Sequence, residues 1–169
     1  MWSFVAVRVA QAIGITGGAW LSGNIAIFSM NVIPALLRSR EETNLPLNAI
    51  AKQWREIYET GKRQNPLVAM ATATAFAYLA VSSHSSSPLL RTGLYTSAAL
   101  LTLGIVPFTV VAMGNTNHSL MRICELGGQN PVGGDARVEG YLQDWVALNM
   151  VRSLFPLAAS LTAIAAAFL

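Results

Sequence analysis

The sequence predicts an all-α integral membrane protein, a four-helix bundle with an amphipathic surface helix between its first and second spans. Of the 169 residues, 53% are hydrophobic and only 11% are charged, whereas about 25% of the residues in a soluble domain are charged. Four long stretches carry no charge, namely those between Arg8 and Arg38, Arg63 and Arg91, and Arg91 and Arg122, and the chain after Arg152. A membrane helix needs roughly 20 apolar residues, so we expect residues 1–169 to form one membrane domain with four spans.

The first span is predicted at residues 10–37. It contains small residues at four-residue steps, a spacing that lets a neighbouring helix approach closely: Gly14, Gly18, Ser22 and Ala26. On another face, Asn24 and Asn31 lie seven residues apart in a stripe with Trp20 and Ile27. Because seven residues are two helical turns, we expect both amides to face inward.

The surface helix is predicted at residues 46–61, beginning at Pro46 and ending at Gly61. Its apolar residues recur on one face, and they are Leu47, Ile50, Trp54, Ile57 and Tyr58. Such a helix lies along the membrane surface with its aromatic rings at headgroup level. The alternative is that it caps the bundle.

Spans two and three are predicted at residues 66–82 and 91–120. Pro107 removes a backbone hydrogen bond inside span three and should bend it. Beyond the bend, Thr109, Met113 and Asn117 fall on one face. His118 points the other way if the helix stays regular.

The fourth span is predicted at residues 138–169. Trp145, Asn149 and Arg152 share one of its faces at steps of three or four. Polar groups at bilayer depth are costly and usually face a bundle interior or a wet cavity. An arginine beside amides suits the binding of a planar, partly anionic organic molecule. The alternative is a structural polar network that ties the helices together.

The loops indicate the orientation of the chain. The connections after spans one and three contain eight basic residues: Arg38, Arg40, Lys52, Arg55, Lys62, Arg63, Arg122 and Arg137. The opposite side has only Arg8 and Arg91. By the positive-inside rule, both termini should be luminal and the two long loops cytosolic.

Several kinds of chemistry are excluded by composition. The net charge of +3 arises in loops that flank a bilayer, so no nucleic acid is expected as a partner. With one cysteine and two separated histidines, no disulfide, haem or metal site is expected. There is no catalytic triad, phosphate-binding loop or dinucleotide fingerprint. The groups left for any chemistry are amides, hydroxyls, aromatic rings, a carboxylate such as Asp144, and the guanidinium of Arg152.

Three short patterns carry a family resemblance. They are Trp54-x-x-x-Tyr58-x-x-Gly61-x-x-x-x-Pro66, then Pro107-Phe108-Thr109 with Met113, Thr116-Asn117 and Leu120, then Trp145-x-x-Leu148-Asn149-x-x-Arg152. In this order they resemble the small four-span membrane family that includes fungal anthrone oxygenases. Asn115 stands where a proline often precedes the Thr-Asn pair in that family.

The resemblance implies that molecular oxygen, as co-substrate, oxidises an anthrone to an anthraquinone without metal, haem or flavin. The acidic methylene of the anthrone would lose a proton, and the electron-rich enolate would react directly with oxygen. Arg152 and Asn149 would hold the enolate oxygen, and Asn117 and Thr109 would add hydrogen bonds. Trp145, Trp54 and Tyr58 would stack on or close over the rings.

The general base is left open between His118, favoured by the usual pKa of histidine, and Asp144. Met113, Asn24 and Asn31 complete the expected substrate-binding set. The resemblance places the reaction in polyketide secondary metabolism, in an endomembrane such as the endoplasmic reticulum or a vesicle. A homo-oligomer, or association with other biosynthetic enzymes, is left open. The alternative function is a non-catalytic membrane scaffold or a small-molecule carrier.

Overall fold

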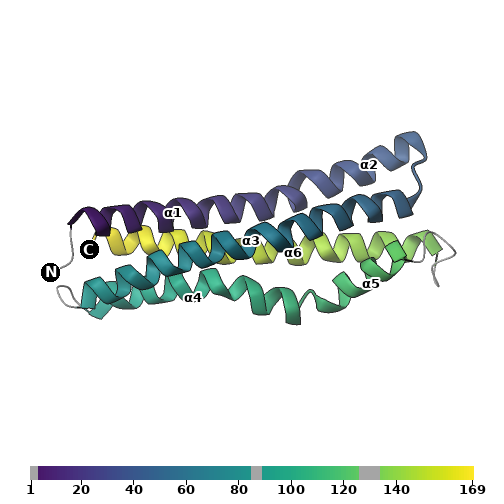
Figure 1. The fold of residues 1–169 in the computed structure, drawn as a ribbon. Coiled ribbons are helices and arrows are strands. Elements are labelled where there is room, and N and C mark those ends of the chain that lie inside the picture. Colours follow the sequence, from purple (N-terminus) through teal and green to yellow (C-terminus); the bar gives the residue numbers. More distant parts are fainter. Residues whose placement is uncertain (1–3, 85–88, 126–133) are drawn as a thin grey trace. The chain divides into compact units, whose positions relative to one another are not determined.

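The structure, a computed structural model, describes residues 4–84, 89–125 and 134–169. These residues form helices and contain no strand, which confirms the all-α class (Figure 1). The elements are α1 (Phe4–Ile27), the π-helical turn η1 (Phe28–Val32), α2 (Ile33–Thr43), α3 (Leu47–His84), α4 (Leu89–Val111), α5 (Gly114–Glu125) and α6 (Gly134–Ala167).

Within this part of the chain, four helical segments are long and apolar enough to cross a membrane. They are Phe4–Arg40, Leu47–Ser83, Leu89–Val111 and Ala136–Ala167. The four predicted spans are thereby confirmed in number and in order. The third is shorter than predicted, because it ends at Val111 instead of near residue 120.

The chain divides into two compact units. Unit 1 comprises Met1–Asn24, Gln64–Pro107 and Ser153–Leu169, and unit 2 comprises Ile25–Arg63 and Phe108–Arg152. Helices α1, α3, α4 and α6 contribute residues to both units, whereas η1, α2 and α5 belong to unit 2 alone.

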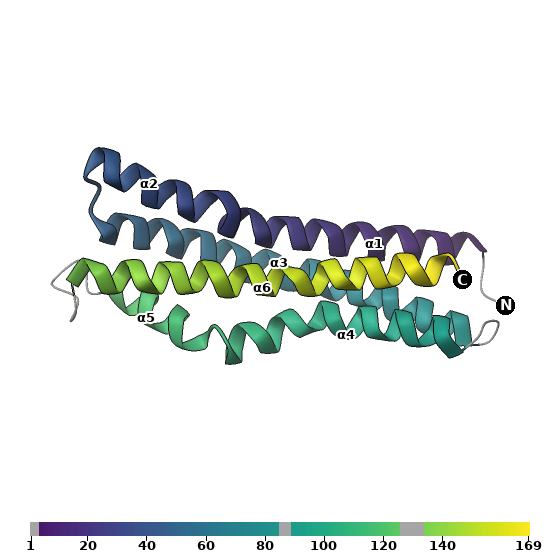
Figure 2. The same ribbon diagram turned by 180° about the vertical axis from the view of Figure 1, so that it is seen from behind.

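The core of unit 1 is made largely of small residues. Its buried members are Ala10, Ala75, Phe76, Leu79, Ala80, Tyr95, Ala98, Ala159, Ala163 and Ala166. A side chain added at Gly14 would overlap the ring of Phe76, and one at Gly18 would come within 3.1 Å of the Pro156 carbonyl oxygen. In this unit the first part of α1 runs beside the last part of α6 (Figures 1 and 2). The close approach predicted from the small residues is therefore confirmed at Gly14 and Gly18.

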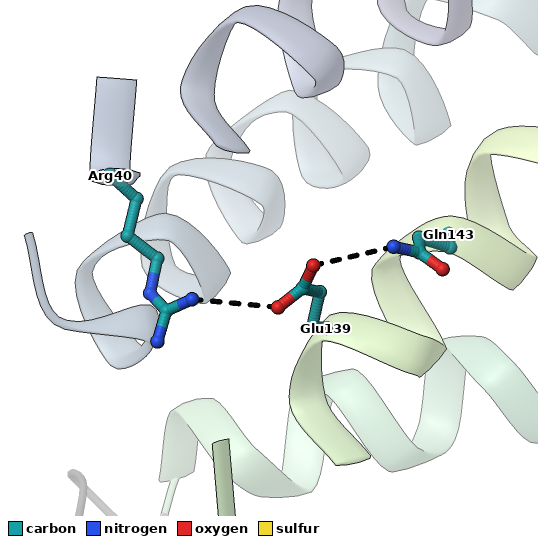
Figure 3. Close-up of polar contacts among 3 residues, drawn as sticks. All are labelled: Arg40, Glu139 and Gln143. Carbon is teal, nitrogen blue, oxygen red and sulfur yellow. Dashed lines mark hydrogen bonds and ion pairs between the residues drawn. The ribbon is translucent and has the colours of Figure 1, made fainter. Parts of the chain in front are cut away.

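The core of unit 2 contains larger side chains. Its buried members are Ile33, Leu47, Ile50, Ala51, Trp54, Met113, Leu120, Ile123, Cys124, Val138, Leu142 and Trp145. The apolar stripe predicted for residues 46–61 is helical: Leu47, Ile50 and Trp54 are buried in this core, and Ile57 and Tyr58 are partly buried against it. The Arg40 guanidinium forms a 3.4 Å ion pair with Glu139, which also accepts a hydrogen bond from Gln143 (Figure 3). This contact links α2 to α6 at the edge of unit 2.

The helix stop predicted at Gly61 is wrong. Helix α3 continues through Gly61 and Pro66 to His84, so the amphipathic segment is the first part of a spanning helix. Glycine ends a helix only where the chain takes up a left-handed conformation there. Proline is tolerated in membrane helices because neighbouring groups satisfy the backbone that it frees. The position of this segment at the membrane surface stays a prediction.

The third span is divided, contrary to the prediction of one helix over residues 91–120. Helix α4 passes through Pro107 and ends at Val111, and α5 begins at Gly114. Between them the N–H groups of Ala112 and Met113 both donate to the Phe108 carbonyl, at 2.9 and 3.3 Å. Pro107 itself lies inside α4, and the helix ends beyond it in this wider turn.

The inward face predicted for the first span is also wrong, except at Asn24, which is half-buried and bonds to Asn65. Asn31 is exposed, Trp20 is 49% exposed and Ile27 is 41% exposed, whereas Ile25 and Ser29 are buried. Lipid tails are as apolar as a protein core, so apolar periodicity does not reveal which face of a membrane helix points inward. The π-helical turn η1 then shifts the register further, since it adds a residue to one turn.

Candidate functional site

The site is built around Arg152 in α6. Its Nη1 donates to the Thr109 hydroxyl in α4 at 3.0 Å, and its Nη2 donates to Asn149 Oδ1 at 2.7 Å. Arginine is always charged and presents its donors as a rigid planar fork. Within the described residues no carboxylate pairs with this guanidinium. Unit 2 therefore holds a partly buried cation whose protein partners are all neutral.

Asn149 fixes the position of Arg152. It is fully buried, and its Nδ2 donates to the Ile25 carbonyl and to the Ser29 hydroxyl, each at 2.8 Å. Both acceptors lie at or just before η1, whose wider turn is a feature often found at functional sites. Asn149 thus uses both of its N–H donors on the first helical segment and gives an oxygen to Arg152. The result is a chain of hydrogen bonds from Ile25 to Thr109.

An aromatic cluster precedes this network by one turn of α6. Trp145 meets Trp54 edge to face, with ring centroids 6.0 Å apart and planes at 87°. Tyr58 stacks on Trp54 at 5.3 Å and 16°. Trp145 and Arg152 lie seven residues apart on α6, so the aromatic cluster and the cation share one face of that helix.

Among the described residues of unit 2, four buried polar atoms have no hydrogen-bond partner. They are Trp54 Nε1, Trp145 Nε1, Arg152 Nε and Asn117 Oδ1. Buried polar groups in folded proteins are almost always paired, and leaving one unpaired costs about 1–3 kcal/mol. Three of these atoms carry N–H donors and one is an acceptor. Such a set is typical of a site whose ligand supplies the missing partners.

The structure brings most of the predicted site residues together in unit 2. Hydrogen bonds join Arg152, Asn149 and Thr109, while Trp54, Tyr58, Trp145 and Met113 pack in one core. Asn117 is buried in α5, on the face that also carries Leu120. Its neighbour His118 is exposed, as the helical geometry predicted.

Two predicted substrate-binding residues lie elsewhere. Asn31 is exposed, so the prediction that it faces inward is wrong, for the reasons of register given above. Asn24 belongs to unit 1, where its Nδ2 donates to Asn65 Oδ1 at 2.9 Å. Sequence reasoning missed Ser29 and the Ile25 carbonyl, because nothing in the residue pattern marks a π-helical turn.

A separate hollow of about 300 Å³ opens on unit 2. It is lined by Lys52, Gln53, Arg55, Glu56 and Cys124. Burial raises the pKa of the Cys124 thiol, while the charges of Arg55 and Lys52 act in the opposite direction. A thiol with a raised pKa is a poor nucleophile at neutral pH. This hollow contains none of the predicted site residues.

The described residues include no group of three or more His, Cys, Asp or Glu side chains that could hold a metal ion. The site instead offers a guanidinium, amides, a hydroxyl and indole N–H groups. These are hydrogen-bond donors suited to oxygen atoms, and in particular to an oxygen that develops negative charge. The cofactor-free mechanism remains a prediction.

Fold and site together define a small helical membrane protein with a polar, partly unsatisfied interior. Residues 54–162 match the family described as anthrone oxygenase. The chain is 37% identical to the anthrone oxygenase encC of Aspergillus fumigatus, over 93% of this chain and 91% of that protein. It is 32% identical to the monooxygenase hypC of Dothistroma septosporum (87% and 76%) and 31% identical to the anthrone oxygenase tpcL of A. fumigatus (91% and 90%). The chain belongs to the anthrone oxygenase family. No solved structure matches it.

Proposed function

We propose that this protein is a membrane-bound anthrone oxygenase, which converts an anthrone and molecular oxygen into an anthraquinone and water. Its relatives named anthrone oxygenase support the reaction class. The observation that carries the assignment to a site is the Arg152 guanidinium, which is bonded to neutral partners and has an unpaired buried Nε–H. A cation in that state is suited to an anionic oxygen.

The reaction begins with removal of a methylene proton from the anthrone, which places negative charge on the carbonyl oxygen. Arg152 stabilises that enolate by a charge-assisted hydrogen bond. The enolate gives one electron to oxygen, forming a carbon radical and superoxide. Their recombination and protonation yield a hydroperoxide at the former methylene carbon. Loss of water then produces the quinone carbonyl, so each anthraquinone formed consumes one molecule of oxygen.

Asn149 and Thr109 have a positioning role in this proposal. Both N–H donors of Asn149 and one of its oxygen lone pairs are already engaged within the protein. Asn149 therefore orients the guanidinium and does not itself hold the substrate. Asn117 Oδ1 is unpaired and buried, so it can accept a hydrogen bond from a substrate hydroxyl. The roles of Asn149 and Asn117, alike at first sight, are thus different.

We assign the proton acceptor to Tyr58. His118 and Asp144, the two residues that sequence considerations left open, are both exposed. Tyr58 is half-buried and stacks on Trp54, whose ring meets Trp145 on the helix that carries Arg152. As general base, the Tyr58 oxygen would take the methylene proton at the place where the enolate forms.

We base the setting of the reaction on the four apolar spans, on the basic residues of the loops between them and on the family to which the chain belongs. We propose that the protein resides in an endomembrane with both termini luminal, and that its substrate is a planar aromatic polyketide. We further propose that no metal, haem or flavin takes part. Elemental analysis and an absorbance spectrum of the active purified protein test this last point, since a stoichiometric metal or a Soret band would contradict it.

The test of the proposed function is turnover by the purified full-length chain in detergent. An anthrone is incubated under air, and both anthraquinone formation and oxygen uptake are followed. We expect one molecule of oxygen to be consumed for each anthraquinone formed. Both rates should lie well above those of a heat-inactivated control. Equal rates in the two samples would overturn the proposed function and favour a scaffold or carrier.

A further inference from the structure

Two indole N–H groups in unit 2 are unexplained by the fold. The Trp54 and Trp145 side chains are 0% and 2% exposed, and neither Nε1 has a hydrogen-bond partner. Buried indoles usually find an acceptor for their N–H group. A phenylalanine would supply an aromatic ring without an unpaired donor. The choice of tryptophan at both positions therefore calls for a partner outside the chain.

The geometry of the pair does not satisfy both donors. In an edge-to-face contact, only one ring directs its edge at the face of the other, so at most one N–H can be used in an N–H···π contact. Tyr58 stacks on Trp54 and holds that ring in place. At least one donor stays unpaired, on a ring that its neighbours fix rigidly.

The distance along α6 between Trp145 and Arg152 is comparable to the length of a tricyclic substrate. Trp145 is seven residues before Arg152 on α6, which is about 10 Å at 1.5 Å per residue. A system of three fused six-membered rings is of comparable length. A flat tricyclic molecule with its keto oxygen at Arg152 would thus extend toward the indoles through the outer-ring substituents that lie farthest from that oxygen.

We infer that the indole N–H groups of Trp54 and Trp145 donate hydrogen bonds to oxygen substituents on the substrate rings, and that these two residues determine the specificity of the site. The inference rests on the proposed function. It concerns oxygens other than the enolate oxygen that Arg152 holds. The four unpaired atoms of the site match a substrate with several ring oxygens. Its acceptor oxygens would take hydrogen bonds from the three N–H donors, and one of its hydroxyl groups would donate to Asn117 Oδ1.

The experiment compares two substrates and two variants. Anthrone has only the keto oxygen, whereas 3,6-dihydroxyanthrone has two further oxygens on its outer rings, away from the keto oxygen that Arg152 would hold. We expect the parent to prefer the dihydroxy compound in kcat/KM. Trp54→Phe and Trp145→Phe should each reduce that preference by about fivefold, the value of one neutral hydrogen bond. Trp20→Phe is the matched control, because Trp20 is 49% exposed in unit 1 and its loss should leave the preference intact.

The outcomes separate the inference from the proposed function. If the parent oxidises neither compound faster than the heat-inactivated control, the proposed function fails. If the parent oxidises both with equal kcat/KM, or if the variants lose activity equally toward both, the inference is overturned and the function stands.

A second measurement needs no change in the core. The chain has four tryptophans, so Trp2→Phe combined with Trp20→Phe leaves only the indole N–H signals of Trp54 and Trp145 in a nitrogen-15 NMR spectrum. Saturation with 2,7-dihydroxyanthraquinone, the expected product of 3,6-dihydroxyanthrone, should move at least one signal downfield, and unsubstituted anthraquinone should not. Signals that stay in place with both compounds would overturn the inference.

Discussion

The two units bury polar side chains in different ways. In unit 1, hydroxyl groups bond to backbone carbonyls, as Thr102 does to Ala98 at 2.9 Å and Ser160 to Ile15 at 3.1 Å. In unit 2, a guanidinium, an amide and two indoles keep buried atoms unpaired. Within the described part of unit 1, such atoms are confined to the first turn of α4, as at Thr92 Oγ1. The difference supports the proposal that unit 2 provides the binding site, and it leaves unit 1 the role of stabilising the fold.

Core composition supports the same division. Unit 1 packs alanines, with Gly14 and Gly18 allowing close contact, whereas unit 2 packs Trp54, Trp145 and Met113. Small residues favour close helix association in a membrane. Large aromatic rings offer a flat apolar surface with a polar edge. Substitutions should therefore affect turnover in unit 2 and stability in unit 1.

The largest effect is expected at Arg152. Arg152→Gln removes the charge beside the enolate and should slow turnover by about a hundredfold to a thousandfold. Arg152→Lys keeps the charge but loses the planar fork, so it should retain only part of the activity. Turnover of an anthrone is measured on monodisperse protein. Arg8→Gln is the control, because Arg8 belongs to unit 1 and bonds to Gln11. Full activity in Arg152→Gln would contradict the electrostatic role, and loss of folded protein would favour a structural one.

The second effect concerns Tyr58. Tyr58→Phe keeps the stacked ring and removes the proton acceptor, which should slow turnover by about a hundredfold. Its activity should recover as the pH rises, since more substrate then arrives already ionised. The measurement is the pH profile of kcat/KM for variant and parent. Tyr95→Phe is the control in unit 1, where the Tyr95 hydroxyl accepts a hydrogen bond from Gln11 at 2.9 Å. Parallel pH profiles for Tyr58→Phe and the parent would contradict the assignment.

A smaller effect distinguishes two neighbours in α5. Asn117→Ala removes a buried acceptor with an unpaired oxygen and should reduce kcat/KM by about tenfold. His118→Ala changes an exposed side chain and should leave kcat/KM within about twofold of the parent. Both are compared at equal folded yield. The reverse ranking would return His118 to the role of general base.

The smallest effect on turnover is expected in unit 1. Gly18→Val places a side chain against Ser160 and the Pro156 carbonyl, and such overpacking costs about 1–3 kcal/mol of stability. Thermal unfolding in detergent should shift downward, while kcat per folded molecule stays unchanged. Gly23→Ala is the control, because nothing lies within 4 Å of the added carbon. A large loss of kcat in folded Gly18→Val would contradict the proposal that unit 1 affects stability and not turnover.

The sequence by itself determined the four spans, since charges are too costly to place within a bilayer and their gaps mark the helices. It also determined that Trp145, Asn149 and Arg152 share a face, because α6 is regular between them. The predicted opposite orientation of Asn117 and His118 is found in the structure even though the third span is divided, because α5 begins at Gly114 and contains both residues.

Only the tertiary structure decided which face of α1 points inward, where α3 continues and which polar atoms remain unpaired. Ser29 is buried and Asn31 exposed, although both are polar residues in an apolar segment. A lipid-facing side chain and a core side chain are equally apolar, so the sequence pattern does not separate them. Gly61 and Pro66 likewise stop a helix or not according to what packs around them. The unpaired indoles depend on contacts between α3 and α6, which local residue patterns do not encode.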